Sequence, residues 1–142
     1  MASFRELLAT TKSRIREVDT AEADRMRSDD GAVVLDVREA DEFEQGAVPG
    51  SVFIPRGTLE SAIENRITDK DATVLVLCAG GVRSAFAAES LQLLGYSDVA
   101  AVVGGVYKWK DVGREWAVRE TLSAAERQRA MGRRRLPEVG EV

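Results

Sequence analysis

The chain has 142 residues, 44% of them hydrophobic and 31% charged, which fits one folded domain. Its net charge of −4 argues against nucleic-acid binding, because phosphate contacts need clustered lysines and arginines. Without histidine and with one cysteine, it cannot form a Cys/His zinc site, an internal disulfide or a histidine-dependent catalytic pair. We expect no metal and no other cofactor. The longest apolar run, residues 74–79, is too short for a membrane span, so we expect a cytoplasmic protein with no membrane partner.

Helices and strands are expected to alternate along most of the chain. Apolar residues at helical spacing indicate an N-terminal helix or arm within residues 1–15. Thr20 is the expected N-cap of a short helix that ends near Ser28. The following elements are a strand over 33–35, a helix over 39–45, a strand over 52–54 and a helix over 59–67.

The second half contains the clearest strand prediction. Residues 73–77 are apolar after a β-branched start, which is typical of a central strand buried on both faces. A glycine-rich turn follows, and a helix opened by Ser84 is expected to run to Leu94. A strand over 99–103, a turn at Gly104-Gly105 and a helix over 106–112 complete the pattern. This alternation predicts an α/β domain with a mainly parallel sheet and a ligand site at the carboxyl ends of the strands.

The turn after the predicted central strand carries the candidate chemistry. It reads Cys78-Ala79-Gly80-Gly81-Val82-Arg83-Ser84. Because it joins a strand to a helix N-terminus, its backbone N–H groups can converge on one point and form an anion pocket around Cys78. Gly80 and Gly81 allow backbone conformations that are costly for other residues. A lone cysteine after an apolar strand is often only a buried hydrophobe. The two glycines and Arg83 instead favour a reactive thiolate.

This loop resembles the active-site loop of the rhodanese family, which runs from a cysteine through four residues to a basic residue. Segments before and after it also look like that family, in the same order. They are Leu35-Asp36-Val37-Arg38-Glu39, Glu42-Phe43, Gly46, Val48-Pro49-Gly50-Ser51, Ile54-Pro55, Leu94-Gly95-Tyr96, Val99, Gly104-Gly105 and Trp109. The resemblance covers about residues 16–116. It implies a three-layer α/β fold with a mainly parallel five-stranded sheet and helices on both faces.

The resemblance implies a sulfurtransferase that carries sulfane sulfur as a persulfide on Cys78. The implied donor is thiosulfate or a protein persulfide, and the implied acceptor is a thiol, cyanide or a sulfur-carrier protein that becomes thiocarboxylated. Arg83 would stabilise the charged states, together with the loop residues Ala79, Gly80, Gly81, Val82 and Ser84. Asp36, Arg38 and Glu42 look like a charge network that supports the loop, although an ordinary surface ion network is the alternative.

Two positions depart from the family pattern. Ala79 stands where a second basic residue commonly follows the cysteine, and Ala47 stands where a histidine commonly precedes the Val-Pro-Gly turn. The change at Ala79 leaves fewer charges for binding thiosulfate. We therefore expect weak activity with thiosulfate and better activity with a protein persulfide.

The C-terminal segment, residues 117–142, is predicted to be a helical tail. Ser123 and Glu126 have the spacing of a capping box, so a helix is expected to begin there. Residues 135–140 resemble the opening segment of adenylyltransferases that activate sulfur-carrier proteins, which implies an adenylyltransferase partner. A plain surface helix with a frayed end is the alternative.

Two other functions remain open. A cysteine phosphatase of the cell-cycle dual-specificity type has a similar fold and loop, but it places five residues between cysteine and arginine. Here four residues separate Cys78 from Arg83, which suits sulfur better than a phosphoryl group. A non-catalytic docking module would use the surface of the fold without its chemistry, and the presence of Cys78, Gly81 and Arg83 argues against it.

Overall fold

The apolar run that predicts a central strand forms β4 (Thr73–Leu77) in the computed structural model, which describes residues 3–118. β4 lies in the middle of a five-stranded sheet with the order β1-β5-β4-β2-β3. All pairings within this sheet are parallel. The other strands are β1 (Arg16–Val18), β2 (Val33–Asp36), β3 (Val52–Phe53) and β5 (Asp98–Val102). The predicted α/β fold with a parallel five-stranded sheet is confirmed.

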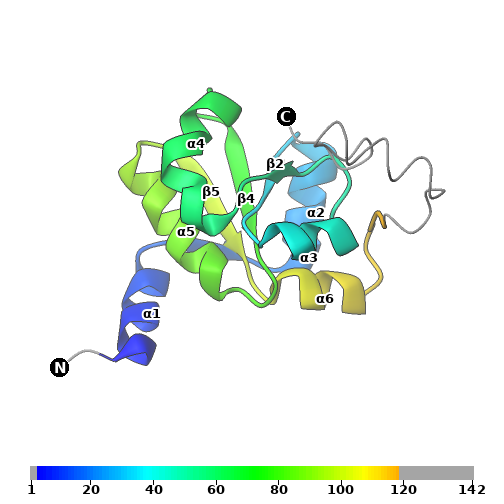
Figure 1. Cartoon of the computed structure of the whole chain (residues 1–142), viewed down its shortest axis with the longest axis horizontal. Helices are drawn as coiled ribbons and strands as arrows, with labels where there is room; N and C mark the ends of the chain where they lie inside the picture. The colour runs from blue at the N-terminus through cyan, green and yellow to red at the C-terminus, as the bar shows by residue number, and fades with distance from the viewer. Residues whose placement is uncertain (1–2, 119–142) are drawn as a thin grey trace.

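Helices cover both faces of the sheet (Figure 1). They are α1 (Phe4–Ser13), α2 (Thr20–Asp29), α3 (Ala40–Gln45), α4 (Leu59–Arg66), α5 (Val82–Leu93) and α6 (Gly105–Asp111), with a 3-10 turn at Arg56–Thr58. No helix within residues 3–118 is long and apolar enough to cross a membrane.

The side chains of β4 explain the two layers of helices. Successive residues of a strand point to opposite faces, so Val74 and Val76 enter one core and Leu75 and Leu77 the other. The first core is closed by α4 and α5, and the second by α2 and α6. All four β4 side chains are at most 1% exposed, and burying each contributes about 1.5–3 kcal/mol. This burial fixes the position of the residue that follows Leu77.

Three local predictions differ from the structure. The strand β1 was not predicted, because it is a short edge strand in which only Val18 is buried. The N-cap of α2 is Asp19 rather than Thr20, and its carboxylate accepts a hydrogen bond from the N–H of Glu22 at 2.8 Å. The helix α5 begins at Val82 rather than Ser84, because Gly81 makes the turn with a φ of 108°.

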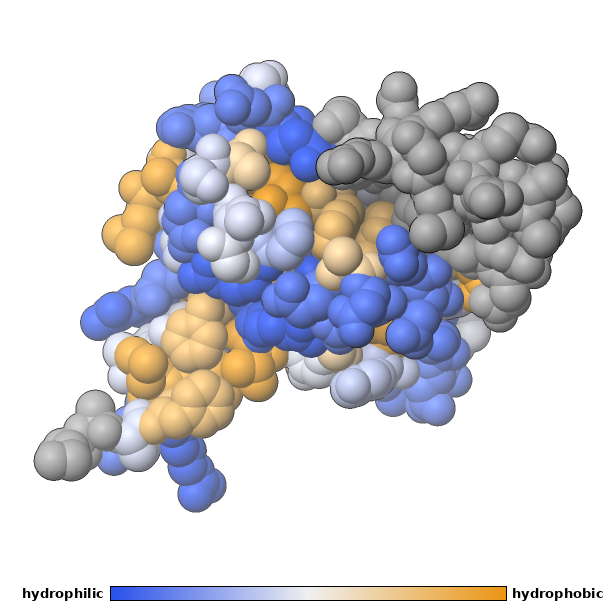
Figure 2. Space-filling model, viewed as in Figure 1, coloured by the Kyte–Doolittle hydropathy of each residue, from blue (hydrophilic) through white to orange (hydrophobic). Residues whose placement is uncertain are grey.

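The N-terminal helix α1 extends from the side of the domain and packs on α5 (Figure 1). The Thr11 hydroxyl donates a hydrogen bond to Glu89 of α5 at 3.2 Å, and the Phe4 ring lies 6.3 Å from that of Phe86. Phe4 and Leu7 nevertheless remain 61% and 54% exposed. Figure 2 shows the resulting apolar surface over α1 in orange.

The described chain ends beside α3. Ala117 forms an antiparallel bridge with the buried Ala47, through reciprocal backbone hydrogen bonds of 2.9 Å. Contacts with the domain thus extend one residue beyond the predicted boundary at 116. The predicted capping box at Ser123 and Glu126 and the segment 135–140 lie outside the described residues.

Candidate active site

Cys78 lies directly after β4, at the carboxyl edge of the sheet, and is 1% exposed. Its Sγ accepts hydrogen bonds from the backbone N–H of Gly81 at 3.0 Å and of Ser84 at 3.3 Å. The Ser84 hydroxyl oxygen lies 3.4 Å from the same sulfur. Three polar groups therefore converge on Sγ at the start of α5. The two N–H groups donate to the sulfur, whereas the Cys78 thiol donates to the Ser84 hydroxyl, which can donate in return when Cys78 is a thiolate.

The two loop glycines have different roles. Gly81 is the N-cap of α5 and adopts a left-handed conformation that is costly for residues with a side chain. Gly80 does not adopt a positive φ, so the prediction that both glycines use this freedom is wrong for Gly80. A Cβ atom at Gly80 would instead lie 3.8 Å from the ring of Tyr107, an ordinary contact distance. The exposed Tyr107 therefore forms part of the rim of the loop.

A second glycine turn, at the start of α6, holds the loop in place. The N–H groups of Val106 and Tyr107 donate hydrogen bonds to the carbonyl oxygens of Cys78 at 2.8 Å and Ala79 at 3.1 Å. Because C=O and N–H of a trans peptide point in opposite directions, the N–H groups of the next residues face away from α6. A Cβ atom at Gly105 would overlap both carbonyl oxygens. Gly105 thus has a positioning role, whereas its sequence pattern indicated only a turn.

The guanidinium of Arg83 binds the carboxylate of Glu42 through both of its terminal nitrogens, at 2.6 and 3.1 Å. This bidentate bond lowers the pKa of Glu42 to about 2 and raises the pKa of Arg83. Both side chains are about one-third exposed. A Coulombic interaction with Cys78 also raises the pKa of Arg83, and the charge of Arg83 is partly compensated by Glu42. The sequence did not predict this pairing.

Asp36 and Arg38 form a separate, buried ion pair behind the loop. The Nε and Nη2 atoms of Arg38 donate to the two carboxylate oxygens of Asp36 at 3.0 and 2.8 Å. Arg38 also donates to the carbonyl oxygens of Glu42 at 3.3 Å and Gly46 at 2.8 Å, which ties the end of β2 to α3. The three residues of the predicted network therefore belong to two separate ion pairs, Arg38 with Asp36 and Glu42 with Arg83. Asp36 and Arg38 position α3, and the side chain of Glu42 binds Arg83.

The orientation of Glu42 is itself fixed. The backbone N–H of Glu39, the N-cap of α3, donates a hydrogen bond to Oε1 of Glu42 at 2.9 Å. The Glu42 carboxylate is thus held between the first turn of α3 and Arg83.

Within residues 3–118, no group of three or more metal-ligating side chains comes together here or elsewhere.

Acid should weaken the link between Arg83 and Glu42. Because the pKa of Glu42 is lowered, its contribution to stability is complete above the ordinary value of 4.5 and is lost as the pH falls towards about 2. We expect Glu42→Gln to remove this dependence, so that the native protein loses about 1 kcal/mol more stability than the variant over this range. Urea unfolding at a series of pH values measures this. Parallel pH profiles for the two proteins would contradict it.

Comparison with known proteins places this geometry in one family. Residues 19–112 match the family Rhodanese-like domain. The thiosulfate sulfurtransferase GlpE of Pseudomonas putida is 34% identical over 98 residues, which cover 69% of this chain and 87% of GlpE. YrkF of Bacillus subtilis, a candidate sulfur carrier protein, is 37% identical over 82 residues. That match covers 58% of this chain and 43% of YrkF, so the chain spans less than half of this relative's length.

Solved structures agree with this assignment. A protein of Rhodopseudomonas palustris, described as of unknown function and a possible tyrosine phosphatase, superposes with a TM-score of 0.73 at 31% identity, over 80% of this chain and 93% of that chain. A rhodanese-related protein of Thermoplasma volcanium superposes with a TM-score of 0.62 at 33% identity, over 72% of this chain and 97% of that chain. With the family match and the cysteine loop at the end of β4, the chain belongs to the rhodanese-like domain family.

Proposed function

We propose that this chain is a sulfurtransferase that carries sulfane sulfur as a persulfide on Cys78. The convergence of the Gly81 and Ser84 N–H groups and the Ser84 hydroxyl on Sγ carries the proposal. These groups stabilise the thiolate before transfer and the persulfide anion after it. The relationship to a thiosulfate sulfurtransferase, GlpE, supports the same chemistry.

With a thiol or cyanide as the acceptor, the reaction has two steps, and Cys78 is regenerated at the end. The Cys78 thiolate attacks the outer sulfur of the donor, and the donor bond to that sulfur breaks. Sulfite leaves when the donor is thiosulfate, and a thiolate leaves when it is a protein persulfide. An acceptor thiol or cyanide then takes the outer sulfur, and the Cys78 thiolate leaves. With an activated carrier carboxyl group, the persulfide displaces the activating group and forms an acyl disulfide, which two equivalents of an external thiol must reduce to release the thiocarboxylate and Cys78. Because the chain contains one cysteine, no internal disulfide can form and the sulfur must pass to another molecule.

The loop backbone binds the charged groups in this proposal. The first N–H groups of a helix have no partner inside it, so those of Val82 and Arg83 are available to the donor. Ala79 and Gly80 contribute backbone N–H groups, and Arg83 adds charge at the rim. Asp36 and Arg38 act as positioning residues behind the loop. A sulfur-carrier acceptor and an adenylyltransferase partner are further proposals, of which the second rests on residues 135–140 alone.

Intact-mass spectrometry tests the proposal. The protein is incubated with thiosulfate or with a persulfide-loaded cysteine desulfurase, and the gain of one sulfur atom is measured before and after reductant. We expect one sulfur atom that reductant removes, located by peptide mapping on the peptide that contains Cys78. No gain from either donor would instead favour a docking module.

The pairing of Arg83 with Glu42 suggests a preference among donors. Thiosulfate is a small dianion and depends on positive charge at the loop, whereas a protein persulfide has other surface contacts. The structure leaves Arg83 compensated by Glu42, and Ala79 supplies no second charge. We therefore propose that a protein persulfide is the better donor and that Glu42 disfavours thiosulfate.

The Glu42→Gln variant tests this preference. It removes the compensating charge but keeps an oxygen that can accept from Arg83. We expect kcat/KM for thiosulfate to rise about fivefold, mainly through KM, and the rate with the protein persulfide to change less than about twofold. Glu64→Gln is the matched control, because Glu64 forms an exposed ion pair with Lys70 near the amino end of β4. If both variants raised kcat/KM for thiosulfate equally, the rise would come from the change in net charge, and the proposed role of Glu42 would be contradicted.

A phosphatase is the second candidate function, because the similar R. palustris structure is described as a possible tyrosine phosphatase. Four residues separate Cys78 from Arg83, and Arg83 is engaged by Glu42. Both features leave less room and less charge for a phosphoryl group. We expect no hydrolysis of p-nitrophenyl phosphate by the protein that accepts sulfur. Turnover that depends on Cys78 would favour the phosphatase.

A further inference from the structure

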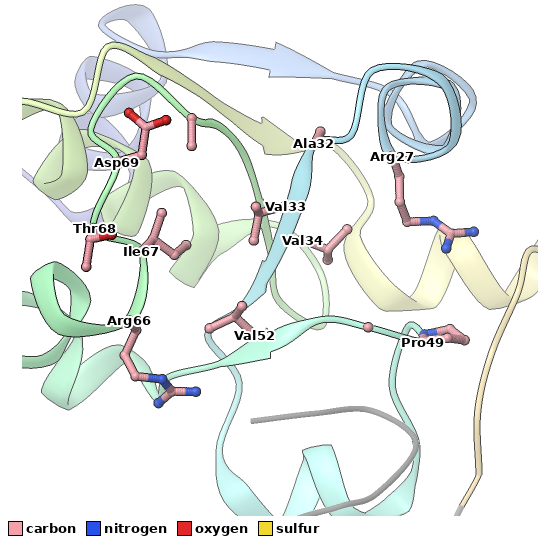
Figure 3. A pocket seen from close by; sticks show the side chains of 12 residues that line it. Arg27, Ala32, Val33, Val34, Pro49, Val52, Arg66, Ile67, Thr68 and Asp69 are labelled. Atoms are coloured by element: carbon pink, nitrogen blue, oxygen red, sulfur yellow. The ribbon is translucent and has the colours of Figure 1, made fainter. Parts of the chain in front are cut away.

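Residues 114–117, the strap, follow α6 and run beside α3 (Figure 1). The strap is anchored to α2 and α6 through one of its residues, Glu115. The Glu115 carboxylate binds Arg27 of α2 at 2.8 Å, and its carbonyl oxygen accepts a hydrogen bond from the Trp109 indole of α6 at 2.8 Å. Figure 3 shows Arg27 extending from α2 towards α6. These contacts fix the start of the strap on the domain.

Trp116, the aromatic residue of the strap, lies directly on the end of α3. A Cβ atom at Gly46, the C-cap of α3, would overlap Nε1 and Cε2 of the indole. The buried Nε1 has no hydrogen-bond partner among residues 3–118, so the indole is held here by packing. Ala117 then pairs with Ala47 through reciprocal backbone hydrogen bonds of 2.9 Å. The strap therefore covers the two residues that follow α3.

The indole of Trp116 also contacts the cation that holds α3 in place. The Cζ atom of Arg38 lies over the ring, 5.5 Å from its centre, which is within the range of a cation–π interaction. Arg38 is 4% exposed and donates hydrogen bonds to the carbonyl oxygens of Glu42 and Gly46, at 3.3 and 2.8 Å. Trp116 thus contacts both the end of α3 and the guanidinium that ties α3 to β2.

The position of α3 matters for the active site because this helix carries Glu42. A bidentate bond such as that between Glu42 and Arg83 depends on the distance and the orientation of both groups. We propose that Trp116 is a positioning residue for the active site. Through Arg38 and the end of α3, it holds this helix in the place from which Glu42 binds Arg83. It thereby sets how much of the Arg83 charge a small anionic donor meets.

The pKa of Glu42 reports this positioning without any sulfur transfer. The bond from Arg83, the N–H of Glu39 and the charge of Arg38 lower this pKa to about 2. In Trp116→Ala we expect it to rise towards the ordinary 4.5, because the bond from Arg83 loosens. NMR of the Glu42 carboxyl carbon measures it: over about pH 5 to 3, the signal should hardly move in the native protein and should titrate in the variant. An unchanged pKa would overturn the proposal.

Two further substitutions separate the aromatic contact from a general loss of packing. Trp116→Phe keeps an aromatic face for Arg38 and removes only an N–H without a partner among residues 3–118, so the pKa of Glu42 should stay close to its native value. Trp116→Leu keeps apolar bulk on Gly46 but no aromatic face, so the pKa should rise by an intermediate amount. An equal rise in the Phe and Ala variants would contradict the proposal. If Trp116→Ala did not fold, Trp116→Leu would decide by the same criterion.

The donor preference tests the consequence for catalysis, and this part rests on the proposed sulfur transfer. In Trp116→Ala we expect KM for thiosulfate to fall about threefold and kcat to change less than about twofold, because Arg83 is less compensated. In a Glu42→Gln background the same substitution should change KM less than about 1.5-fold, because it acts through the Glu42 charge.

The two backgrounds and the NMR titration separate the possible failures. An equal change in KM in both backgrounds, or an equal loss of kcat, would show that Trp116 acts on the fold in general and would overturn its role through Glu42. If the native protein accepted no sulfur from either donor, the proposed function would fail, while the titration of Glu42 would still decide whether Trp116 positions α3.

Discussion

The Cys78→Ser protein should accept no sulfur from either donor while keeping its fold. The serine oxygen can accept hydrogen bonds from the N–H groups of Gly81 and Ser84, as Sγ does now. The change is small, and the position is buried at the end of β4. A serine hydroxyl without a base is a far weaker nucleophile than the thiolate that the proposed transfer uses. We expect transfer to cyanide, measured as thiocyanate, to fall by at least about a thousandfold.

The melting temperature of the same variant separates chemistry from folding. A melting temperature close to that of the native protein, together with no thiocyanate and no added sulfur mass, supports Cys78 as the carrier. Thiocyanate formation at a substantial fraction of the native rate would show that Cys78 does not carry the sulfur. If the variant kept the biological role of the protein, the docking module would be favoured.

The Gly105→Ala variant should lose both activity and stability. Gly105 has a φ of 57° in the native protein, a left-handed conformation that costs a residue with a side chain about 1–2 kcal/mol. The new methyl group would also push away the carbonyl oxygens of Cys78 and Ala79, whose hydrogen bonds to α6 contribute about 1 kcal/mol each. We expect about 3–4 kcal/mol less stability by urea unfolding. We also expect about a hundredfold lower kcat/KM, because the loop moves relative to the bound donor.

Gly113→Ala is the matched control for this substitution. Gly113 also has a left-handed φ, 75°, but a Cβ atom there would meet nothing within 4 Å. We expect it to lose only the backbone cost of about 1–2 kcal/mol and to keep its activity. If both variants behaved alike, the contact of Gly105 with the loop would have no special role. A selective loss in Gly105→Ala would identify α6 as part of the machinery that positions Cys78.

The elements with a strong apolar pattern were predictable from the sequence. The bounds of β4 agree with its prediction, because every residue from Val74 to Leu77 is buried between two layers of helices. The strand β1 lacked this signal, because Arg16 and Glu17 are exposed and the strand is defined by its pairing with β5. Edge strands of this kind gain their structure from a distant partner rather than from their own composition.

The same distinction applies to the candidate site. The loop from Cys78 to Ser84 is one continuous segment, so the convergence of its N–H groups on Cys78 could be predicted from local sequence. The pairing of Arg83 with Glu42 joins residues 41 positions apart, and no local pattern indicates it. The contact of Gly105 with the Cys78 carbonyl oxygen also depends on how β4 and β5 lie side by side. The local sequence thus predicts the loop itself, whereas the contacts that hold the loop in place depend on the tertiary structure.

The hydrogen bonds from α6 to the loop link the geometry of the cysteine loop to the order of protein synthesis. Cys78 leaves the ribosome before Val106 and Tyr107, whose N–H groups fix the carbonyl oxygens of Cys78 and Ala79. Until those residues have been made and folded, the donors around Sγ lack this support. In a nascent chain, these carbonyl oxygens are therefore fixed only after α6 has been synthesised and has packed against the sheet.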